Sequence, residues 1–222
     1  MTATDWNTLA SVATALGTLV LAVATFAAIR TASRAARIAE RAMIAGLSPV
    51  LMPTRLEDAT QKVNFGDRKW VVLPGGGAVA EIGGGDGSMG ATDDVIYLAI
   101  ALRNAGTGMA VLHGWILYPG WHRSDGPPDP DRFRQHTRDL YVPSGDIGFW
   151  QGALRDRSEP LHAEAHRVIE AREPWTVDLM YGDHEVGERV ISRFTVFPRG
   201  DQDWVASSTR HWNIDRAGTV RN

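Results

Sequence analysis

The longest apolar stretch of the chain lies near its N-terminus. Residues 6–29 carry no charged side chain and consist mainly of Leu, Val, Ala, Ile and Phe. A helix over these residues is about 36 Å long, which is enough to cross a hydrocarbon core of about 30 Å. Its Ser and Thr hydroxyls can donate to carbonyl oxygens of the preceding turn, so lipid tolerates them. The pattern predicts a transmembrane helix.

Three other interpretations of this segment fit less well. A signal peptide has a basic N-terminal region and a shorter apolar run, whereas residues 1–8 contain no Lys or Arg. Ala22-Val23-Ala24 nevertheless resembles a cleavage site, so this interpretation stays open. A core helix of a soluble protein seldom lacks charge over such a length. A helix lying in the membrane interface would need a polar face, which this segment does not have.

Four arginines follow the apolar segment at intervals of four, three and four residues. This spacing places them on one face of a helical stalk, residues 30–48, whose helix ends near Ala45 because Gly46 and Pro49 follow. Basic residues beside a membrane span favour the cytoplasmic side. We therefore expect residues 1–5 outside the cell and the C-terminal part in the cytoplasm. The four are Arg30, Arg34, Arg37 and Arg41.

The arginine stripe has two interpretations. It can bind anionic lipid headgroups or another polyanion, at about 1 kcal/mol for each arginine near the surface. Alternatively, it is a stop-transfer signal on a solvated helix face, while the opposite, alanine-rich face packs on the domain or on a second copy. Small residues four apart, such as Ala13 and Gly17, let helices approach closely in lipid. A homo-oligomer through anchor and stalk is therefore one expectation, although an alanine-rich segment produces such pairs by chance.

After Pro49 the helical period gives way to short apolar segments separated by turn residues. Residues 95–102 are almost continuously apolar, as in a strand buried on both faces, and residues 175–181 alternate. One helix is expected after Pro160, and residues 123–134 read as an exposed loop. Seven to nine strands with little helix predict an antiparallel, immunoglobulin-like β-sandwich over residues 49–222. The other expected strands are 49–56, 69–74, 78–82, 109–118, 189–197 and 204–212.

Composition and charge narrow the possible functions. The chain has 222 residues with 44% hydrophobic and 22% charged, as in a folded protein, and it contains no Cys. This excludes disulfides, thiol nucleophiles and cysteine zinc sites. Of the net charge of −3, residues 30–48 contribute four Arg and one Glu. The β region is therefore acidic, and we expect no nucleic-acid partner.

Two segments could carry chemistry. The glycine-rich residues 75–90 lack the Lys of a phosphate loop and read as a flexible turn. The expected turn after residue 181 presents a His between two carboxylates, which could bind a divalent cation with a distant His. Adjacent strand residues point to opposite faces, so an exposed polar turn is the simpler interpretation. The candidate ligands are Asp183, His184, Glu185, His113 and His211.

Residues 141–150 combine aromatic side chains with glycines. They form either an aromatic recognition loop, since aromatic anchors dominate interfaces, or a loop folded over one end of the sandwich. The candidate contact residues are Tyr141, Phe149 and Trp150. Ser144 and Ser192 lack the G-x-S-x-G context of a hydrolase nucleophile.

Several segments resemble a family of uncharacterised actinobacterial membrane-anchored proteins. They are A-R-I-A-E-R-A-M-I-A-G-L-S-P at 36–49, L-R-N-A-G-T-G at 102–108, L-Y-V-P-S-G-D-I-G-F-W-Q-G-A-L at 140–154, Y-G-D-H-E at 181–185 and R-H-W-N at 210–213. The resemblance covers most of the chain. It implies an actinobacterial source and a helix-then-sandwich layout, and it carries over no activity and no functional residue.

The function that these patterns favour is a membrane-tethered, non-catalytic interaction or scaffolding module at the cytoplasmic face. It would bind an unidentified protein partner and need no cofactor. A metal-binding enzyme or sensor that uses residues 183–185 with a distant His is the alternative. A lipid-headgroup sensor that works through the arginine stripe is a third possibility.

Overall fold

The structure, a computed structural model, divides the chain into two compact units, Met1–Gly46 and Leu47–Asn222. Each unit is described by itself. The residues described are 3–46, 48–63, 80–82, 84–91, 95–183, 188–201 and 203–215.

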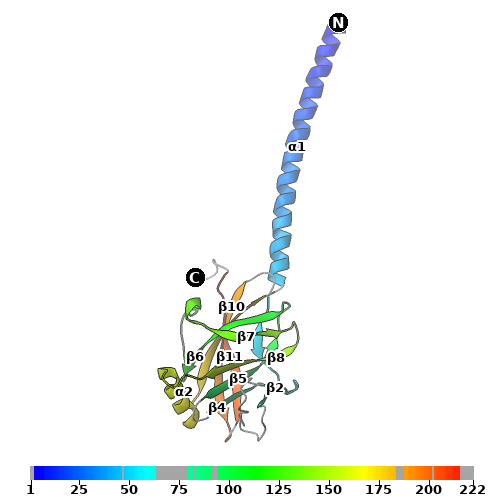
Figure 1. The fold of residues 1–222 in the computed structure, drawn as a ribbon. Helices are drawn as coiled ribbons and strands as arrows, with labels where there is room; N and C mark the ends of the chain where they lie inside the picture. Colours follow the sequence, from blue (N-terminus) through cyan, green and yellow to red (C-terminus); the bar gives the residue numbers. More distant parts are fainter. Residues whose placement is uncertain are drawn as a thin grey trace. The chain divides into compact units, whose positions relative to one another are not determined.

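The first unit is one helix, α1 (Ala3–Gly46), of 44 residues (Figure 1). Within its stretch Ala10–Glu40, an 18-residue window has a mean hydropathy of 2.2, and no part of that window is buried in the protein. The helix is therefore long and apolar enough to cross a membrane, a test that an N-terminal signal sequence also passes. As expected, Thr14, Thr18 and Thr25 donate to carbonyl oxygens one turn earlier, at 2.8–2.9 Å. The helix ends at Gly46, next to the residue expected.

The second unit contains an antiparallel sheet of nine strands. Its order is β1-β5-β4-β11-β10-β9-β6-β7, and β8 pairs with the other edge of β5. The strands are β1 (Leu51–Pro53), β4 (Asp86–Ala91), β5 (Ile96–Asn104), β6 (Ala110–Pro119), β7 (Arg134–Val142), β8 (Ile147–Leu154), β9 (Trp175–Asp183), β10 (Arg189–Arg199) and β11 (Asp203–Asn213).

The sheet curls on itself. The strands β7 and β8 stand at opposite ends of the pairing order, yet they follow each other along the chain and lie in contact. The curled sheet encloses a core with four tryptophans, three of which pack together. The Trp150 ring lies 5.5 Å from Trp115 and 6.3 Å from Trp175, centroid to centroid. The mainly antiparallel β domain is confirmed. Its architecture is one curled sheet, which does not divide clearly into the two layers of an immunoglobulin-like sandwich.

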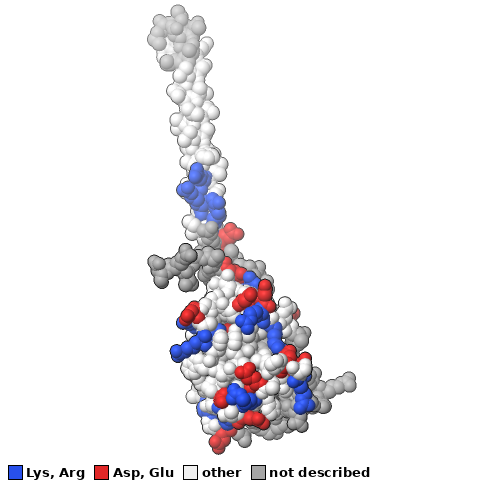
Figure 2. Space-filling view, turned by 90° about the vertical axis from the view of Figure 1, so that its left-hand side faces the viewer, with Lys and Arg blue, Asp and Glu red and all other residues white. Residues whose placement is uncertain are grey.

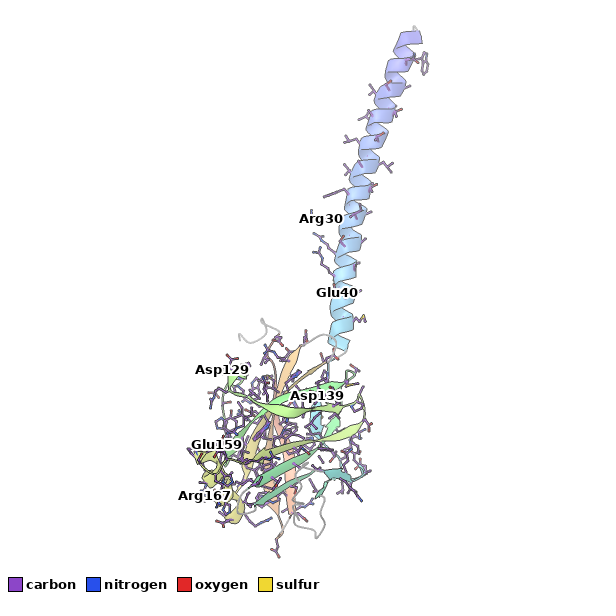
Figure 3. The ribbon with its side chains drawn as sticks, in the orientation of Figure 1. Arg30, Glu40, Asp129, Asp139, Glu159 and Arg167 are labelled. Atoms are coloured by element: carbon purple, nitrogen blue, oxygen red, sulfur yellow. The ribbon has the colours of Figure 1, made fainter. Side chains whose placement is uncertain are left out.

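The helix α2 (Pro160–Glu170) covers part of the curled sheet (Figure 1). It contacts β4, β5 and β6, and it buries Ala165 and Val168 in the core. The predicted helix is confirmed, with Pro160 in its first turn. In front of it, Glu159, which is labelled in Figure 3, accepts a hydrogen bond from Arg134 of β7 at 2.6 Å.

Two smaller layers cover the outer surface of the sheet. A two-stranded ladder, β2 (Gln61–Val63) with β3 (Ala80–Ile82), packs Val63 against the outer side of β5. The segment between β6 and β7, which includes the short 3-10 helix η1 (Pro130–Arg132), packs Phe133 over β6 and β10. The expected strand at residues 69–74 and the turn after it lie outside the described residues.

Candidate functional site

The residues proposed as metal ligands are only partly described. Residues 184–187, which include His184 and Glu185, lie outside the described part of the chain. Asp183 is the last residue of β9 and is buried. Among the described residues, no group of three His, Asp or Glu side chains could hold a metal ion.

His113 lies at a bulge in β6, where the register with both β7 and β9 shifts between Leu112 and Gly114. Its ring lies over Gly182, because a Cβ added there would be 3.0 Å from His113 Nε2. Burial first and the charge of Arg189 second lower the pKa of His113, although Asp139 raises it. A polar hollow of about 470 Å³ opens beside this bulge.

His211 belongs to a different surface. It lies on β11, which β10 and β9 separate from β6, a separation of about 14 Å along the sheet. His113 and His211 therefore cannot share one ion, because zinc ligands lie about 2 Å from the metal. Asp183 alternates with Gly182 and so faces away from His113.

His211 instead ends a chain of hydrogen bonds that starts in the core. The Leu51 amide donates to the Tyr181 hydroxyl at 3.1 Å, and that hydroxyl lies 2.7 Å from Ser192 Oγ. Ser192 Oγ lies 2.6 Å from His211 Nδ1. Burial lowers the pKa of His211, which favours the neutral ring as an acceptor from Ser192. Ser192 is fully buried, so its hydroxyl serves this relay and no substrate can reach it.

The arginine stripe lies on α1. Arg30, Arg34 and Arg37 are exposed, and Figure 2 shows basic side chains gathered on this helix. Arg30 and Glu40 project from the helix in Figure 3. Arg37 Nε donates to the Ser33 carbonyl at 3.2 Å. The backbone of Arg41 is part of α1, and its side chain lies outside the described atoms.

The expected recognition loop is a hairpin of two strands. The turn between β7 and β8 comprises residues 143–146, with Gly145 at φ 72°. Trp150 is fully buried in the core and offers no surface to a partner. Tyr141 is exposed and Phe149 is partly buried against the core. The alternation of the two faces of β8 explains this split.

The most unusual polar group is a buried ion pair on the outer face of the sheet. Arg193 of β10 donates to both carboxylate oxygens of Asp178 of β9, at 2.7 and 2.6 Å. The Asp178 side chain has no exposed surface, and that of Arg193 is 3% exposed. The register pairs the two residues directly. This geometry matches the bidentate arrangement in which Arg–carboxylate hydrogen bonds are strongest.

Aromatic rings and a loop enclose the Arg193 guanidinium. Its Cζ lies 5.5 Å from the Tyr118 ring centroid and 5.0 Å from that of Trp212, within cation–π range. Arg193 Nη1 also donates to Ser124 Oγ at 2.9 Å. The loop that carries Ser124 is tied to the sheet at Thr176, whose hydroxyl accepts from the His122 amide and donates to the Gly120 carbonyl.

A hollow of about 390 Å³ lies between this loop and β11. This site was not predicted from the sequence. One signal was available, because Asp178 and Arg193 are charged residues in the middle of two mostly apolar strands of one expected hairpin. Opposite charges at facing positions stabilise a strand pair. The turn length, and therefore the register, could not be read from residues 182–188.

The fold and the site define a class: a β domain attached to a long apolar helix, with a polar cluster on the outer face of its sheet. Comparison with known proteins adds no family, since no family model and no curated protein matches. Among solved structures, a protein from Archaeoglobus fulgidus matches with 11% identity and a TM-score of 0.23. The match covers 57% of this chain and 92% of that chain. This likeness is too distant to support an inference about the fold or the function of this chain.

Proposed function

We propose that this chain is a single-pass membrane protein whose β domain, residues 49–222, is a non-catalytic interaction module in the cytoplasm. The observation that carries the proposal is the exposure of α1. Leu19, Val20, Leu21 and Phe26 are each more than 60% exposed, and the whole apolar stretch is unburied. Such a surface is stable in lipid and costly in water.

The proposed orientation places the N-terminus outside. The arginines of α1 follow its apolar stretch, while Asp5 is the one charged side chain in residues 1–29. Lys and Arg near the end of a span are retained on the cytoplasmic side. The β domain follows these arginines and would therefore be cytoplasmic.

A binding role is favoured because polar side chains of the described residues hydrogen-bond one another. Ser192 and His211 hydrogen-bond each other, and Arg193 is held by Asp178. These contacts hold a scaffold together, and they support surface loops on a rigid sheet, which is the usual setting of binding sites. The resemblance to actinobacterial membrane-anchored proteins agrees with this layout. A homo-oligomer formed through α1 and an unidentified protein partner are further parts of the proposal.

The absence of Cys from the sequence allows a direct test of topology. Thr4→Cys and Ser207→Cys would each introduce a single thiol, the second at an exposed position of β11. A membrane-impermeant maleimide should label the Thr4 variant in intact cells and the Ser207 variant only after permeabilisation. The reverse labelling would overturn the orientation. An extracted chain shortened at residue 24 would show that α1 is a signal sequence.

The interaction role requires a second experiment. Chemical cross-linking in native membranes, followed by purification in mild detergent, should recover the same partner or second copy with the full chain in repeated preparations. A chain that ends at residue 48 should lose a partner that binds the β domain and keep one that binds the helix. Recovery of the full chain alone under cross-linking conditions would contradict the proposal.

A further inference from the structure

The hollow beside Arg193 has an excess of positive charge. Asp178, Arg193 and Arg210 face one another in turn across β9, β10 and β11. The ion pair neutralises Arg193, but Arg210 faces it from the other side, and like charges at facing positions destabilise a sheet. Among the described residues, Arg210 Nη1 reaches the carbonyl oxygens of Ser124 and Asp125, at 3.5 and 3.4 Å, which are long hydrogen bonds.

A second arginine approaches the same hollow from the loop. Arg123 lies with its Cζ 5.3 Å from the Trp121 ring centroid. Neither Arg123 nor Arg210 has a carboxylate partner within the part of the chain that the structure describes. The carboxylate of Asp125 balances one of the two charges, so the lining keeps an excess of one positive charge. An anion in the hollow would complement it.

The lowered pKa of His122 is consistent with positive charge around this hollow. Its ring stacks on Tyr118 with a centroid distance of 3.9 Å. Burial lowers the pKa of His122, and the charges of Arg193 and Arg132 lower it further, against the opposing effect of Asp178. At neutral pH the ring is therefore uncharged and adds no repulsion to the arginines that surround it.

Trp121 supplies an apolar wall. It is 55% exposed, and its ring makes a T-shaped contact with Phe197 at 5.3 Å between the centroids. An exposed aromatic ring can stack on a flat ligand. The hollow thus combines two guanidinium groups with one aromatic surface.

We propose that this hollow binds a small phosphate monoester that carries a flat ring. Arg123 and Arg210 bind the phosphate, and Trp121 contacts the ring. A phosphate offers three acceptor oxygens to guanidinium groups that come from two different elements, whereas a carboxylate offers two. The site concerns the β domain alone, so its test is independent of the membrane topology proposed above.

The test is isothermal titration calorimetry on the full chain in detergent. Phenyl phosphate should bind, glycerol phosphate and inorganic phosphate should bind more weakly, and phenol should not bind. Arg210→Gln should weaken phenyl phosphate at least about tenfold, since a charge-assisted hydrogen bond is lost. Trp121→Leu should remove the preference for phenyl phosphate over inorganic phosphate. Arg55→Gln, at an exposed arginine outside the hollow, is the matched control and should leave the affinity unchanged.

Three results would overturn the proposal. The first is no heat of binding with millimolar phenyl phosphate. The second is an equal loss of affinity in the Arg55 and Arg210 variants, which would indicate unspecific attraction to net charge. The third is tighter binding of glycerol phosphate than of phenyl phosphate, which would assign the hollow to a lipid headgroup. Circular dichroism of each variant confirms that the β domain is folded.

Discussion

The strands β9 and β10 bury both of their faces, but the two faces are stabilised differently. On the inner face, Trp150, Trp175 and Phe194 pack in an apolar core. On the outer face, the Arg193–Asp178 pair lies between Tyr118 and Trp212. An apolar core depends on volume and tolerates swaps that conserve it. A buried ion pair depends on both partners, because either one left alone is a desolvated charge.

The largest effect is expected from breaking the ion pair. Asp178→Ala leaves the Arg193 guanidinium buried without its carboxylate and should lower the free energy of unfolding by about 3–5 kcal/mol. Chemical denaturation followed by tryptophan fluorescence measures the loss. The double variant Asp178→Leu with Arg193→Met removes both charges and should recover most of the stability. A double variant as unstable as the single one would show that the pair itself, and not the orphaned charge, sets the cost.

The matching change on the inner face should cost somewhat less. Trp150→Leu removes part of the ring volume at the centre of the three tryptophans. Replacing a buried Trp by Ala costs about 3–5 kcal/mol, and the retained Leu side chain reduces this to about 2–3 kcal/mol. The same denaturation experiment tests it. A loss larger than that of Asp178→Ala would reverse the ranking of the two faces.

A smaller loss of stability is expected at Tyr181, whose polar hydroxyl lies within the apolar core. Tyr181→Phe keeps the buried ring but removes the hydroxyl that accepts from the Leu51 amide and bonds Ser192. Leaving buried groups short of a partner should cost about 1–2 kcal/mol. Ser192→Ala serves as a comparison, because it keeps the Leu51–Tyr181 bond. Unchanged stability in the Tyr181 variant would show that these bonds make no net contribution.

The smallest effect is a dependence on pH. Burial is the first cause of a lowered pKa in His113, His122 and His211. The unfolded chain therefore binds protons more readily than the folded one near pH 6.5. These histidines therefore do not reduce the free energy of unfolding above about pH 6.5. The free energy of unfolding decreases as the pH falls from about 6.5 toward their lowered pKa values in the folded state. Denaturation at pH 7.5 and pH 5.5 should show this decrease. In His211→Asn the decrease should be smaller, and an identical pH dependence would exclude His211 as a contributor.

The sequence predicted strands best where both faces are buried or alternate. Residues 95–102 were predicted from an apolar run and residues 175–181 from alternation, and β5 and β9 each end two residues beyond the predicted range. The helix after Pro160 was predicted from its apolar stripe. All these signals are local, so they predict an element but not the elements that pack beside it in the fold. The curling of the sheet depends on contact between β7 and β8, which no local pattern encodes.

Glycine explains two of the strands that the sequence did not predict, β4 and β8. The glycine-rich residues 75–90 were expected to form a flexible turn and residues 141–150 a loop, since glycine usually weakens strands. Instead, β4 occupies residues 86–91 and β8 occupies residues 147–154. In the structure these glycines admit neighbouring side chains. A Cβ at Gly87 would lie 2.8 Å from Val196 Cγ1, and one at Gly148 would lie 2.8 Å from Val142 Cγ2. Glycine therefore occurs both in closely packed strands and in flexible turns, and only the tertiary contacts distinguish the two.

The short strand β1 has a mechanical consequence. Any pull on α1 reaches the β domain through residues 48–53. There, Val50 is held by Asn104 Oδ1, and the Leu51 amide is held by the Tyr181 hydroxyl. Tension along the chain would therefore be felt first by Asn104 and next by Tyr181, which connects through Ser192 to His211 on the surface. Two hydroxyl groups thus link the point where the domain is tethered to an ionisable group that solvent can reach.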